Sequence, residues 1–209
     1  IKPAPQVVHC AKVVVEAFRT ALESQGLDPD LVQLVFTDES DAGRALISHA
    51  DVDAVILTGA SATGQLFRSW DPQMNIMAET SGKNALIITP SADPDLAIQD
   101  LYLSAFGHSG QKCSASSLVI FVGAAGDSER LRTQLIDAVS TLIPGPGHDI
   151  TTTMNGLAEA PGEKLLRGLT QLEPGETWLI KPQKLNEEGK EFTAAVGQHR
   201  LVQHHGVGL

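Results

Sequence analysis

The sequence predicts an α/β fold in which part of a doubly wound parallel sheet is followed by part of a second α/β domain. Short apolar runs typical of buried strands alternate with segments whose apolar residues recur every three or four positions. This alternation is typical of strand–helix–strand crossovers and of a parallel sheet. A third observation is a glycine-flanked segment at 59–64, directly after one of the apolar runs. Turns of this kind open helices at the nucleotide-binding edge of doubly wound sheets.

In the first part of the chain, we expect a helix at 7–26, because its apolar residues form one stripe and Gly26 can end it. The stripe consists of Val7, Cys10, Ala11, Val14, Ala17, Phe18 and Ala21, so Cys10 is expected to be packed. A buried strand is predicted at 31–36, a helix near 41–49 and a second strand at 52–57.

The second part begins at a boundary near 81–83 and repeats the same alternation. A strand at 84–89 precedes Asp93 and Pro94, a capping residue and a first-turn proline that favour a helix start. That helix is expected to run to about residue 107. The remaining predictions are strands at 117–122 and 178–182, helices at 128–143 and 162–172, and a loop at 144–147.

Composition and charge argue against several classes of partner. The 209 residues include 15 Lys+Arg against 25 Asp+Glu, a formal net charge of −10. A phosphate backbone would be repelled, so no nucleic-acid partner is expected. No run of about 18 apolar residues is present, so no membrane span is expected either. The two cysteines lie in unrelated settings, which suits a reducing cytoplasm.

One cysteine is a candidate reactive side chain. Cys113 lies among glycines and serines, with Lys112 directly before it. Small neighbours leave a sulfur uncovered, and a cation favours the thiolate, which is the nucleophilic form. Upstream, Glu79 is a potential base for acyl chemistry. From the residues alone, the alternative is that Cys113 is a small buried hydrophobe, as many free cysteines are.

Four motifs, taken in this order along the chain, resemble those of the aldehyde dehydrogenase superfamily. They are Lys2-Pro-Ala-Pro, Leu57-Thr-Gly-Ala-Ser-Ala-Thr-Gly64, Glu79-Thr-Ser-Gly-Lys-Asn-Ala85 and Phe106-Gly-His-Ser-Gly-Gln-Lys-Cys-Ser-Ala115. The last two are similar to the Δ1-pyrroline-5-carboxylate (glutamate-γ-semialdehyde) dehydrogenases, including the module fused to proline dehydrogenase in bifunctional proteins. The resemblance implies a partial NAD-binding domain at 1–82, a partial catalytic domain at 83–192 and an atypical tail at 193–209.

The resemblance also implies the chemistry. An aldehyde, glutamate γ-semialdehyde in this branch, would be oxidised to a carboxylic acid through a thioester on Cys113, and Glu79 would activate the hydrolytic water. Ser114 matches a serine that holds the substrate's α-carboxylate, with a turn-forming serine as the alternative. NAD is the implied cofactor, and no acid or arginine in this sequence separates it from NADP.

The same resemblance assigns the nucleotide contacts. Lys2 corresponds to a lysine that hydrogen-bonds the adenosine ribose, and Gly59, Ala60, Ser61 and Gly64 match the pyrophosphate loop. The sequence departs from the family at Ala60, where serine is usual, and Ser61 is the nearest hydroxyl. An ordinary strand-to-helix turn is the alternative.

No metal site is expected, because the histidines lack ligand spacing with cysteines or carboxylates, and His108 is expected to be structural. Family members run to several hundred residues, so we expect an internal piece, inactive alone, of a homo-oligomeric parent that could be fused to proline dehydrogenase. Two alternatives stay open. One is a non-catalytic module for nucleotide binding or assembly, and the other is a different thiol chemistry, such as that of a thioesterase or a redox cysteine.

Overall fold

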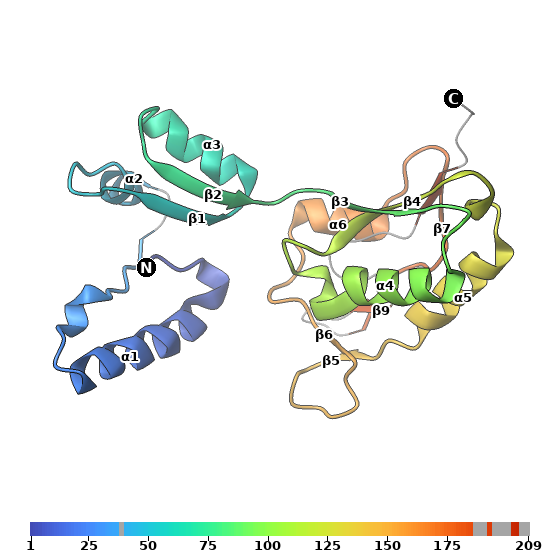
Figure 1. The fold of residues 1–209 in the computed structure, drawn as a ribbon, viewed down its shortest axis with the longest axis horizontal. Helices are drawn as coiled ribbons and strands as arrows, with labels where there is room; N and C mark the ends of the chain where they lie inside the picture. The colour runs from blue at the N-terminus through green and yellow to red at the C-terminus, as the bar shows by residue number, and fades with distance from the viewer. Residues whose placement is uncertain (38–39, 186–191, 194–201, 205–209) are drawn as a thin grey trace. The chain divides into compact units, whose positions relative to one another are not determined.

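The computed structural model describes residues 1–37, 40–185, 192–193 and 202–204. The chain divides into two compact units, Ile1–Ser81 and Gly82–Leu209 (Figure 1). Each unit contains a pair of parallel strands joined through a helix, β1–α3–β2 in the first and β3–α4–β4 in the second. These two crossover elements confirm the α/β prediction.

The first unit holds one parallel strand pair. Its elements are η1 (Pro5–Val7), α1 (Val8–Ser24), η2 (Pro29–Leu31), α2 (Asp41–Ile47), β1 (Val55–Gly59), α3 (Ser61–Trp70) and β2 (Ile76–Thr80). The register runs from Val55 opposite Ile76 to Gly59 opposite Thr80. Helix α3 packs on both strands and buries Phe67. The predicted helices and the second strand are therefore present, the strand starting three residues later than expected.

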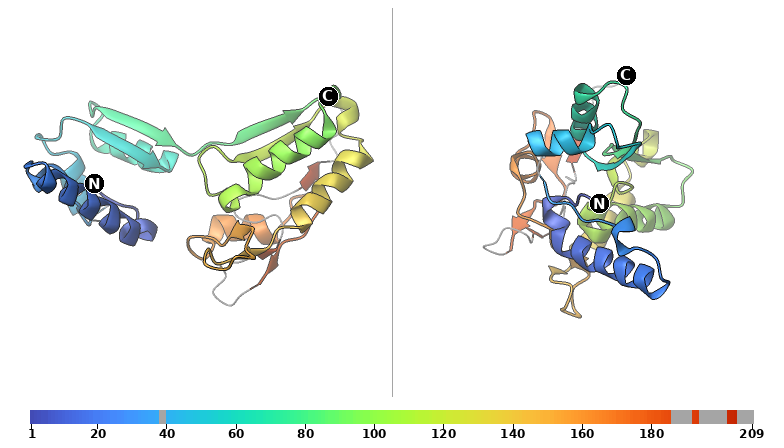
Figure 2. Two further views of the ribbon diagram at one scale, coloured as in Figure 1. Left: turned by 60° about the horizontal axis from the view of Figure 1, so that its bottom comes forward. Right: turned by 90° about the vertical axis from the view of Figure 1, so that its left-hand side faces the viewer.

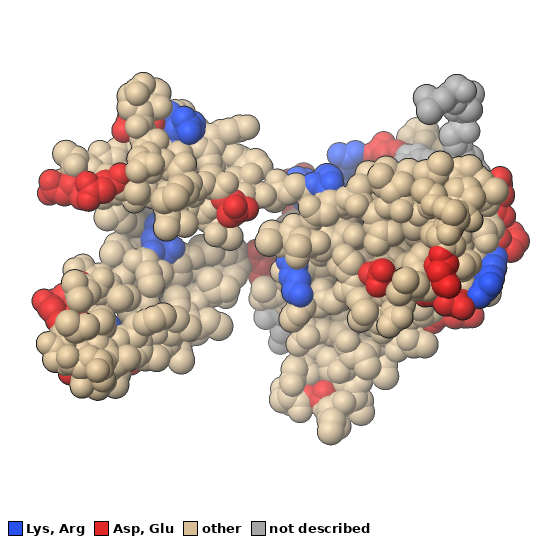
Figure 3. Space-filling model, in the orientation of Figure 1, with Lys and Arg blue, Asp and Glu red and all other residues tan. Residues whose placement is uncertain are grey.

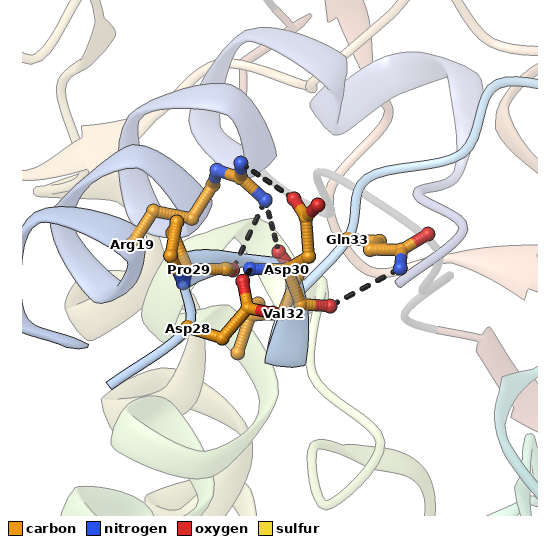
Figure 4. Close-up of polar contacts among 6 residues, drawn as sticks. All are labelled: Arg19, Asp28, Pro29, Asp30, Val32 and Gln33. Atoms are coloured by element: carbon orange, nitrogen blue, oxygen red, sulfur yellow. Dashed lines mark hydrogen bonds and ion pairs between the residues drawn. The ribbon is translucent and has the colours of Figure 1, made fainter. Parts of the chain in front are cut away.

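Helix α1 confirms the predicted helix but buries a different stripe. Val15 is buried, whereas Val14 and Phe18 of the predicted stripe are exposed, and Cys10 is exposed as well. The reason is that α1 turns toward η2. Arg19 donates from α1 to the carbonyl oxygens of Pro29 at 3.0 Å and Val32 at 2.9 Å, and to the Asp30 carboxylate at 2.9 Å (Figure 4).

The strand predicted at 31–36 is wrong. Asp28 accepts a hydrogen bond from the Asp30 amide and begins the 3-10 turn η2, which ends at Leu31. The extended residues that follow are joined to the N-terminal residue by two hydrogen bonds. The Ile1 ammonium donates to the Gln33 carbonyl, and the Val35 amide donates to the Ile1 carbonyl. A strand requires a continuous ladder with a neighbour, and an apolar run alone does not supply that neighbour.

The second unit is larger and contains its own hydrophobic core. Its elements are β3 (Asn84–Ile88), α4 (Pro94–Phe106), η3 (Gly107–Gly110), β4 (Ser116–Phe121), η4 (Gly123–Ala125), α5 (Glu129–Ser140), β5 (Pro144–Gly145), β6 (Met154–Asn155), α6 (Glu163–Thr170), β7 (Glu176–Trp178), β8 (Gln183–Lys184), β9 (Phe192–Thr193) and β10 (Val202–His204). Strands β3 and β4 pair in parallel, as do β5 and β6, while β7–β10 and β8–β9 are antiparallel.

Helix α4 lies along the β3–β4 pair and packs against α5 (Figure 2). Its predicted cap is confirmed, because the Asp93 carboxylate accepts from the amides of Asp95 at 2.9 Å and Leu96 at 3.0 Å. Leu101 of α4 and Val139 of α5 are fully buried in a cluster that also takes in β3, β6 and α6. This core holds the end of α4, and with it the start of the cysteine segment.

Two boundary predictions in the second unit are corrected. The strand expected at 178–182 is β7, Glu176–Trp178, which follows a left-handed Gly175. It was also expected to be the last strand, but β8, β9 and β10 follow it. Pro182 lacks an amide donor and is a poor strand residue. The expected loop at 144–147 begins with the two residues of β5, which pair with β6 when the chain returns. Most of the predicted tail, 193–209, lies outside the described residues.

Charged side chains are mixed on the surface. On the face drawn in Figure 3, Lys and Arg stand singly among Asp and Glu. Across the part of the chain that the structure describes, no helix has both the length and the apolar character needed to cross a bilayer.

Candidate active site

Glu79 and the glycine-flanked turn meet at the carboxyl end of the β1–β2 pair. Glu79 lies on β2, opposite Thr58 of β1, with its side chain exposed. The next residue, Thr80, is opposite Gly59, the last residue of β1. Parallel strands place such residues at one edge of the sheet, which is where ligands of open α/β folds bind.

The turn after β1 is fastened to the end of β2. The Ser81 amide donates to the Gly59 carbonyl at 3.1 Å, and the Ser61 hydroxyl donates to the Ser81 carbonyl at 3.1 Å. Ala60 is the N-cap of α3 and has no side-chain oxygen with which to accept an amide. The hydroxyl of Ser61 is therefore engaged with the β2 end and not with the cap position.

Gly64 faces the strands. A Cβ added there would lie 3.6 Å from the side chains of Leu57 and Thr80, which is ordinary van der Waals contact, so the packing does not itself require a glycine. Gly59 and Ala60 are exposed and precede the first helical amides of α3, which have no intrahelical partners. A phosphate can approach this backbone, so the segment fits the pyrophosphate part of a dinucleotide at Gly59–Ser61, while Gly64 faces the strands.

Lys2 is half-buried and adjoins the 33–35 segment, because its neighbour Ile1 exchanges hydrogen bonds with Gln33 and Val35. It belongs to the same unit as the Gly59–Ser61 turn and Glu79. Cys113 and Ser114 belong to the second unit. The meeting of Glu79 with Cys113 accordingly stays a prediction.

Cys113 and Ser114 are the central residues of a turn before β4. The Ala115 amide donates to the Lys112 carbonyl at 3.2 Å and closes the turn. Both central side chains are exposed, so Cys113 is not the buried hydrophobe of the alternative reading. An exposed thiol on a short, closed turn can approach a carbonyl carbon.

Asn84, the first residue of β3, holds this turn from one side. Its Nδ2 donates to the carbonyl oxygens of Cys113 at 2.6 Å and Ala115 at 2.9 Å. Ser104 of α4 supports the next residue, accepting from the Ser116 amide at 3.2 Å. The turn is therefore fixed by side chains from two other elements.

Side-chain hydrogen bonds also hold the segment before Cys113. His108, Ser109 and Gly110 all have left-handed backbones, with φ of 53°, 57° and 67°. Two consecutive non-glycine residues with positive φ are strained and need tertiary support. Ser109 is buried and its hydroxyl donates to the Asn155 carbonyl.

Gln111 supplies further support with both ends of its amide. Its Nε2 donates to the carbonyls of His108 at 3.1 Å and Gly156 at 3.2 Å, and its Oε1 accepts from the Ala158 amide at 2.8 Å. Sequence reasoning missed the roles of Asn84, Ser109 and Gln111. Asn84 and Gln111 lie inside the quoted motifs. Their carboxamides, placed beside small residues, were the available signal that these side chains could support the backbone.

In the described ranges, no three His, Cys, Asp or Glu side chains group so as to hold a metal ion. The chemistry available here is that of a thiol, a carboxylate and backbone amides. The carboxylate of Glu79 and the glycine-flanked turn lie at the carboxyl end of β1–β2, and the thiol of Cys113 lies on the turn before β4.

Comparison with known proteins finds matches over most of the chain. A family model described as the aldehyde dehydrogenase family matches residues 1–182. The 1-pyrroline-5-carboxylate dehydrogenase of Staphylococcus epidermidis is 38% identical over 128 residues, which are 57% of this chain and 24% of that protein. The chain thus spans about a quarter of the length of that curated relative.

Solved structures give a similar result. Proline utilization A (PutA) from Corynebacterium freiburgense superposes with a TM-score of 0.83 and 64% identity, covering 92% of this chain and 19% of that chain. A double mutant of betaine aldehyde dehydrogenase from Staphylococcus aureus, in complex with NAD+, gives a TM-score of 0.63 and 28% identity, covering 72% of this chain and 30% of that chain.

Proposed function

Since the chain belongs to the aldehyde dehydrogenase family, we propose that it carries the nucleophile, the general base and part of the dinucleotide site of an enzyme that oxidises an aldehyde to a carboxylic acid. The observation that carries this proposal is the exposed thiol of Cys113 on a turn held by Asn84. Asn84 itself lies close to Glu79 along the chain. Each part has the exposure that its role requires.

Glu79 and the residue that supports the cysteine turn are close along the chain. Glu79 lies five residues before Asn84, and five residues of extended chain span at most about 18 Å. Asn84 in turn hydrogen-bonds the backbone of Cys113. The chain leaves β2 one residue after Glu79 and enters β3 at the residue that holds the cysteine turn.

The reaction follows from these groups. The Cys113 thiolate attacks the aldehyde carbon, and the new oxyanion takes a hydrogen bond from a backbone amide such as that of Cys113. Oxidation of the resulting thiohemiacetal carbon to a thioester needs a hydride acceptor, which is the chemistry that a nicotinamide cofactor would supply when bound. Glu79 takes a proton from a water molecule while the oxygen of that water attacks the thioester carbon. The C–S bond then breaks, which releases the carboxylic acid and regenerates the Cys113 thiolate. A positioned carboxylate base contributes about 10²–10⁴-fold to such a step.

The first unit would hold the cofactor. The exposed Gly59 and Ala60 and the start of α3 suit the pyrophosphate, and Lys2 would donate to the adenosine ribose. Support for a nicotinamide cofactor comes from the NAD+ bound in the betaine aldehyde dehydrogenase structure. NAD is proposed, with NADP as the alternative.

The substrate proposed is glutamate γ-semialdehyde, formed from Δ1-pyrroline-5-carboxylate and oxidised to glutamate in proline catabolism. The relative named 1-pyrroline-5-carboxylate dehydrogenase and the PutA neighbour support it. The exposed hydroxyl of Ser114, next to the nucleophile, would donate to the α-carboxylate. The parent is proposed to be a cytoplasmic homo-oligomer, and the PutA neighbour supports a fusion to proline dehydrogenase.

A second candidate, a non-catalytic nucleotide-binding or assembly module, is favoured by Ala60. The N-cap of α3 lacks a side-chain oxygen, which weakens a phosphate site that the family builds with serine. This candidate predicts slow reaction of Cys113.

Alkylation by iodoacetamide, followed by peptide mass spectrometry, tests the proposal on this chain. Cys10 is also exposed and serves as the internal reference. We expect Cys113 to react faster than Cys10, and NAD to change only the rate at Cys113. Slow, NAD-independent reaction at Cys113 would favour the non-catalytic module, and fast reaction indifferent to NAD would favour another thiol chemistry.

Turnover is a separate test. The chain spans about a quarter of its curated relative, so we expect no measurable NADH formation from glutamate semialdehyde by these 209 residues. NADH formation that disappears in Cys113→Ala would contradict the expected inactivity while supporting the chemistry.

A further inference from the structure

We propose that Asn84 is a positioning residue that sets the backbone of the turn carrying Cys113. The proposal rests on the nucleophilic role of Cys113 set out above. Asn84 donates two hydrogen bonds from one nitrogen, at 2.6 Å to the Cys113 carbonyl and at 2.9 Å to the Ala115 carbonyl. The two acceptors flank Ser114, so one side chain holds both sides of the turn's exposed tip.

Only the amide nitrogen of Asn84 can make these contacts. Both partners are carbonyl oxygens, which accept but do not donate, so the NH2 end must face them. An aspartate of the same shape has no donor when ionised. The side chain is itself fixed, because Asn84 begins β3 opposite Ser116 and is half-buried.

The bonds determine which backbone groups the sulfur meets. A trans peptide directs its C=O and N–H to opposite sides, so the Cys113 carbonyl held by Asn84 turns the Ser114 amide away from Asn84. The Ala115 amide is already bonded to the Lys112 carbonyl. Carbonyl oxygens carry partial negative charge and oppose a nearby thiolate. The hydrogen bonds to Asn84 keep two of these carbonyls, those of Cys113 and Ala115, directed at its amide nitrogen.

Three variants test this on the full chain. Asn84→Leu keeps the size of the side chain and removes both donors. Asn84→His places one ring nitrogen donor at a similar reach. Asn75→Leu is the matched control, because the Asn75 amide donates to the Asp53 carbonyl at 3.2 Å in the other unit.

The measurement is the iodoacetamide rate at Cys113, with Cys10 as the reference. We expect Asn84→Leu to lower the Cys113 rate at neutral pH about tenfold, the size of one net hydrogen bond. Asn84→His should restore part of the rate. Asn75→Leu should leave it unchanged, and Cys10 should react equally in all variants.

An unchanged Cys113 rate in Asn84→Leu would overturn the proposal, as would a loss that Asn84→His does not restore in a folded protein. If wild-type Cys113 reacts no faster than Cys10, the proposed function fails. The hydrogen-exchange rate of the Ala115 backbone amide then tests the role of Asn84 by itself. Faster exchange in Asn84→Leu alone would support the positioning of the turn, and equal exchange in wild type and variant would overturn it.

Discussion

The two units share a strand–helix–strand element but differ in how much they bury. In the second unit, α4, α5 and α6 surround a cluster of thirteen buried apolar side chains. Among the described residues of the first unit, the buried apolar side chains are Val15, Phe67 and Met74. The exposed thiol of Cys113 is thus attached to a well-packed unit, whereas the predicted base and the predicted dinucleotide turn belong to a sparsely packed one.

The difference teaches what an apolar strand pattern does and does not specify. Helix α3 covers the face of β1 that carries Val55 and Leu57, while Ile56 is 78% exposed and Met77 on β2 is 53% exposed. Parallel strands are apolar on both sides because both faces are normally covered. The apolar residues of β1 and β2 in the first unit therefore include side chains, Ile56 and Met77, on a face that α3 does not cover.

The largest expected effect separates the two units directly. Leu101→Ala, at a side chain with 0% exposure, should lower the unfolding free energy of the second unit by about 2–5 kcal/mol. Ile56→Ala is the matched control, expected to change stability by less than about 0.5 kcal/mol. Urea unfolding followed separately by Trp70 of the first unit and Trp178 of the second, in single-tryptophan variants, measures both. An equal shift of both probes in Leu101→Ala would mean that the units unfold together.

Gln111→Ala should give the next largest effect, confined to the second unit. It removes the bonds to His108, Gly156 and Ala158, and because the side chain is exposed we expect a loss of only about 1–2 kcal/mol. Hydrogen exchange should accelerate at 108–115 and 156–158. Gln65→Ala, on the exposed side of α3, is the control, and unchanged exchange at 156–158 would contradict the bridging role.

Ala60→Ser should strengthen the sparsely packed unit. A serine at the N-cap of α3 can accept an amide hydrogen bond, and we expect a gain of about 0.5–1 kcal/mol in the unfolding free energy of the first unit. If the Gly59–Ser61 turn binds pyrophosphate, NAD affinity should also rise, which calorimetry measures. A gain in stability without any change in NAD binding would favour an ordinary strand-to-helix turn.

The smallest effect depends on pH and belongs to the second unit. Hydrogen bonds from Gln134 and Arg130, and the charge of Arg130, hold the pKa of Asp95 below its ordinary 3.8. A carboxylate with a lowered folded pKa stabilises the fold above its unfolded pKa, and that contribution is lost as pH falls through the folded value. Asp95→Asn should therefore destabilise the second unit slightly at pH 7. The difference from wild type should shrink as the pH falls below 3.8 and vanish once it passes the lowered pKa of the folded state. Asp100→Asn on the same helix is the control, and a pH-independent difference for Asp95→Asn would contradict this origin.

Much of the fold could be predicted because its signals are local. Apolar periodicity and caps predicted α1, α4, α5 and α6 within a few residues, the turn at 59–64 indicated the start of α3, and Asp93 acts as predicted. The strand at 31–36 failed because a strand depends on a neighbour that the local sequence does not contain. The α1 stripe and Cys10 failed for a related reason, since the side that α1 buries depends on where η2 packs.

The candidate site divides in the same way. Cys113, Ser114, Glu79, Lys2 and the 59–64 segment were recognised by residue type and order in the motifs, and their catalytic and binding roles stay predictions. The supports of the cysteine turn were not recognised. Asn84 and Gln111 act through hydrogen bonds to carbonyls 29 and 45 residues away in sequence, and no spacing rule predicts such contacts.

By itself, the sequence determined the alternation of strands and helices, the helix caps and the order of the motifs, because short-range sterics and hydrogen bonding fix these. Only the tertiary structure decided which faces are buried, that Gly64 packs against strands, and that Asn84 holds the backbone of Cys113. These depend on groups distant in sequence that share a few ångströms of space, and such proximity exists only once the chain has folded.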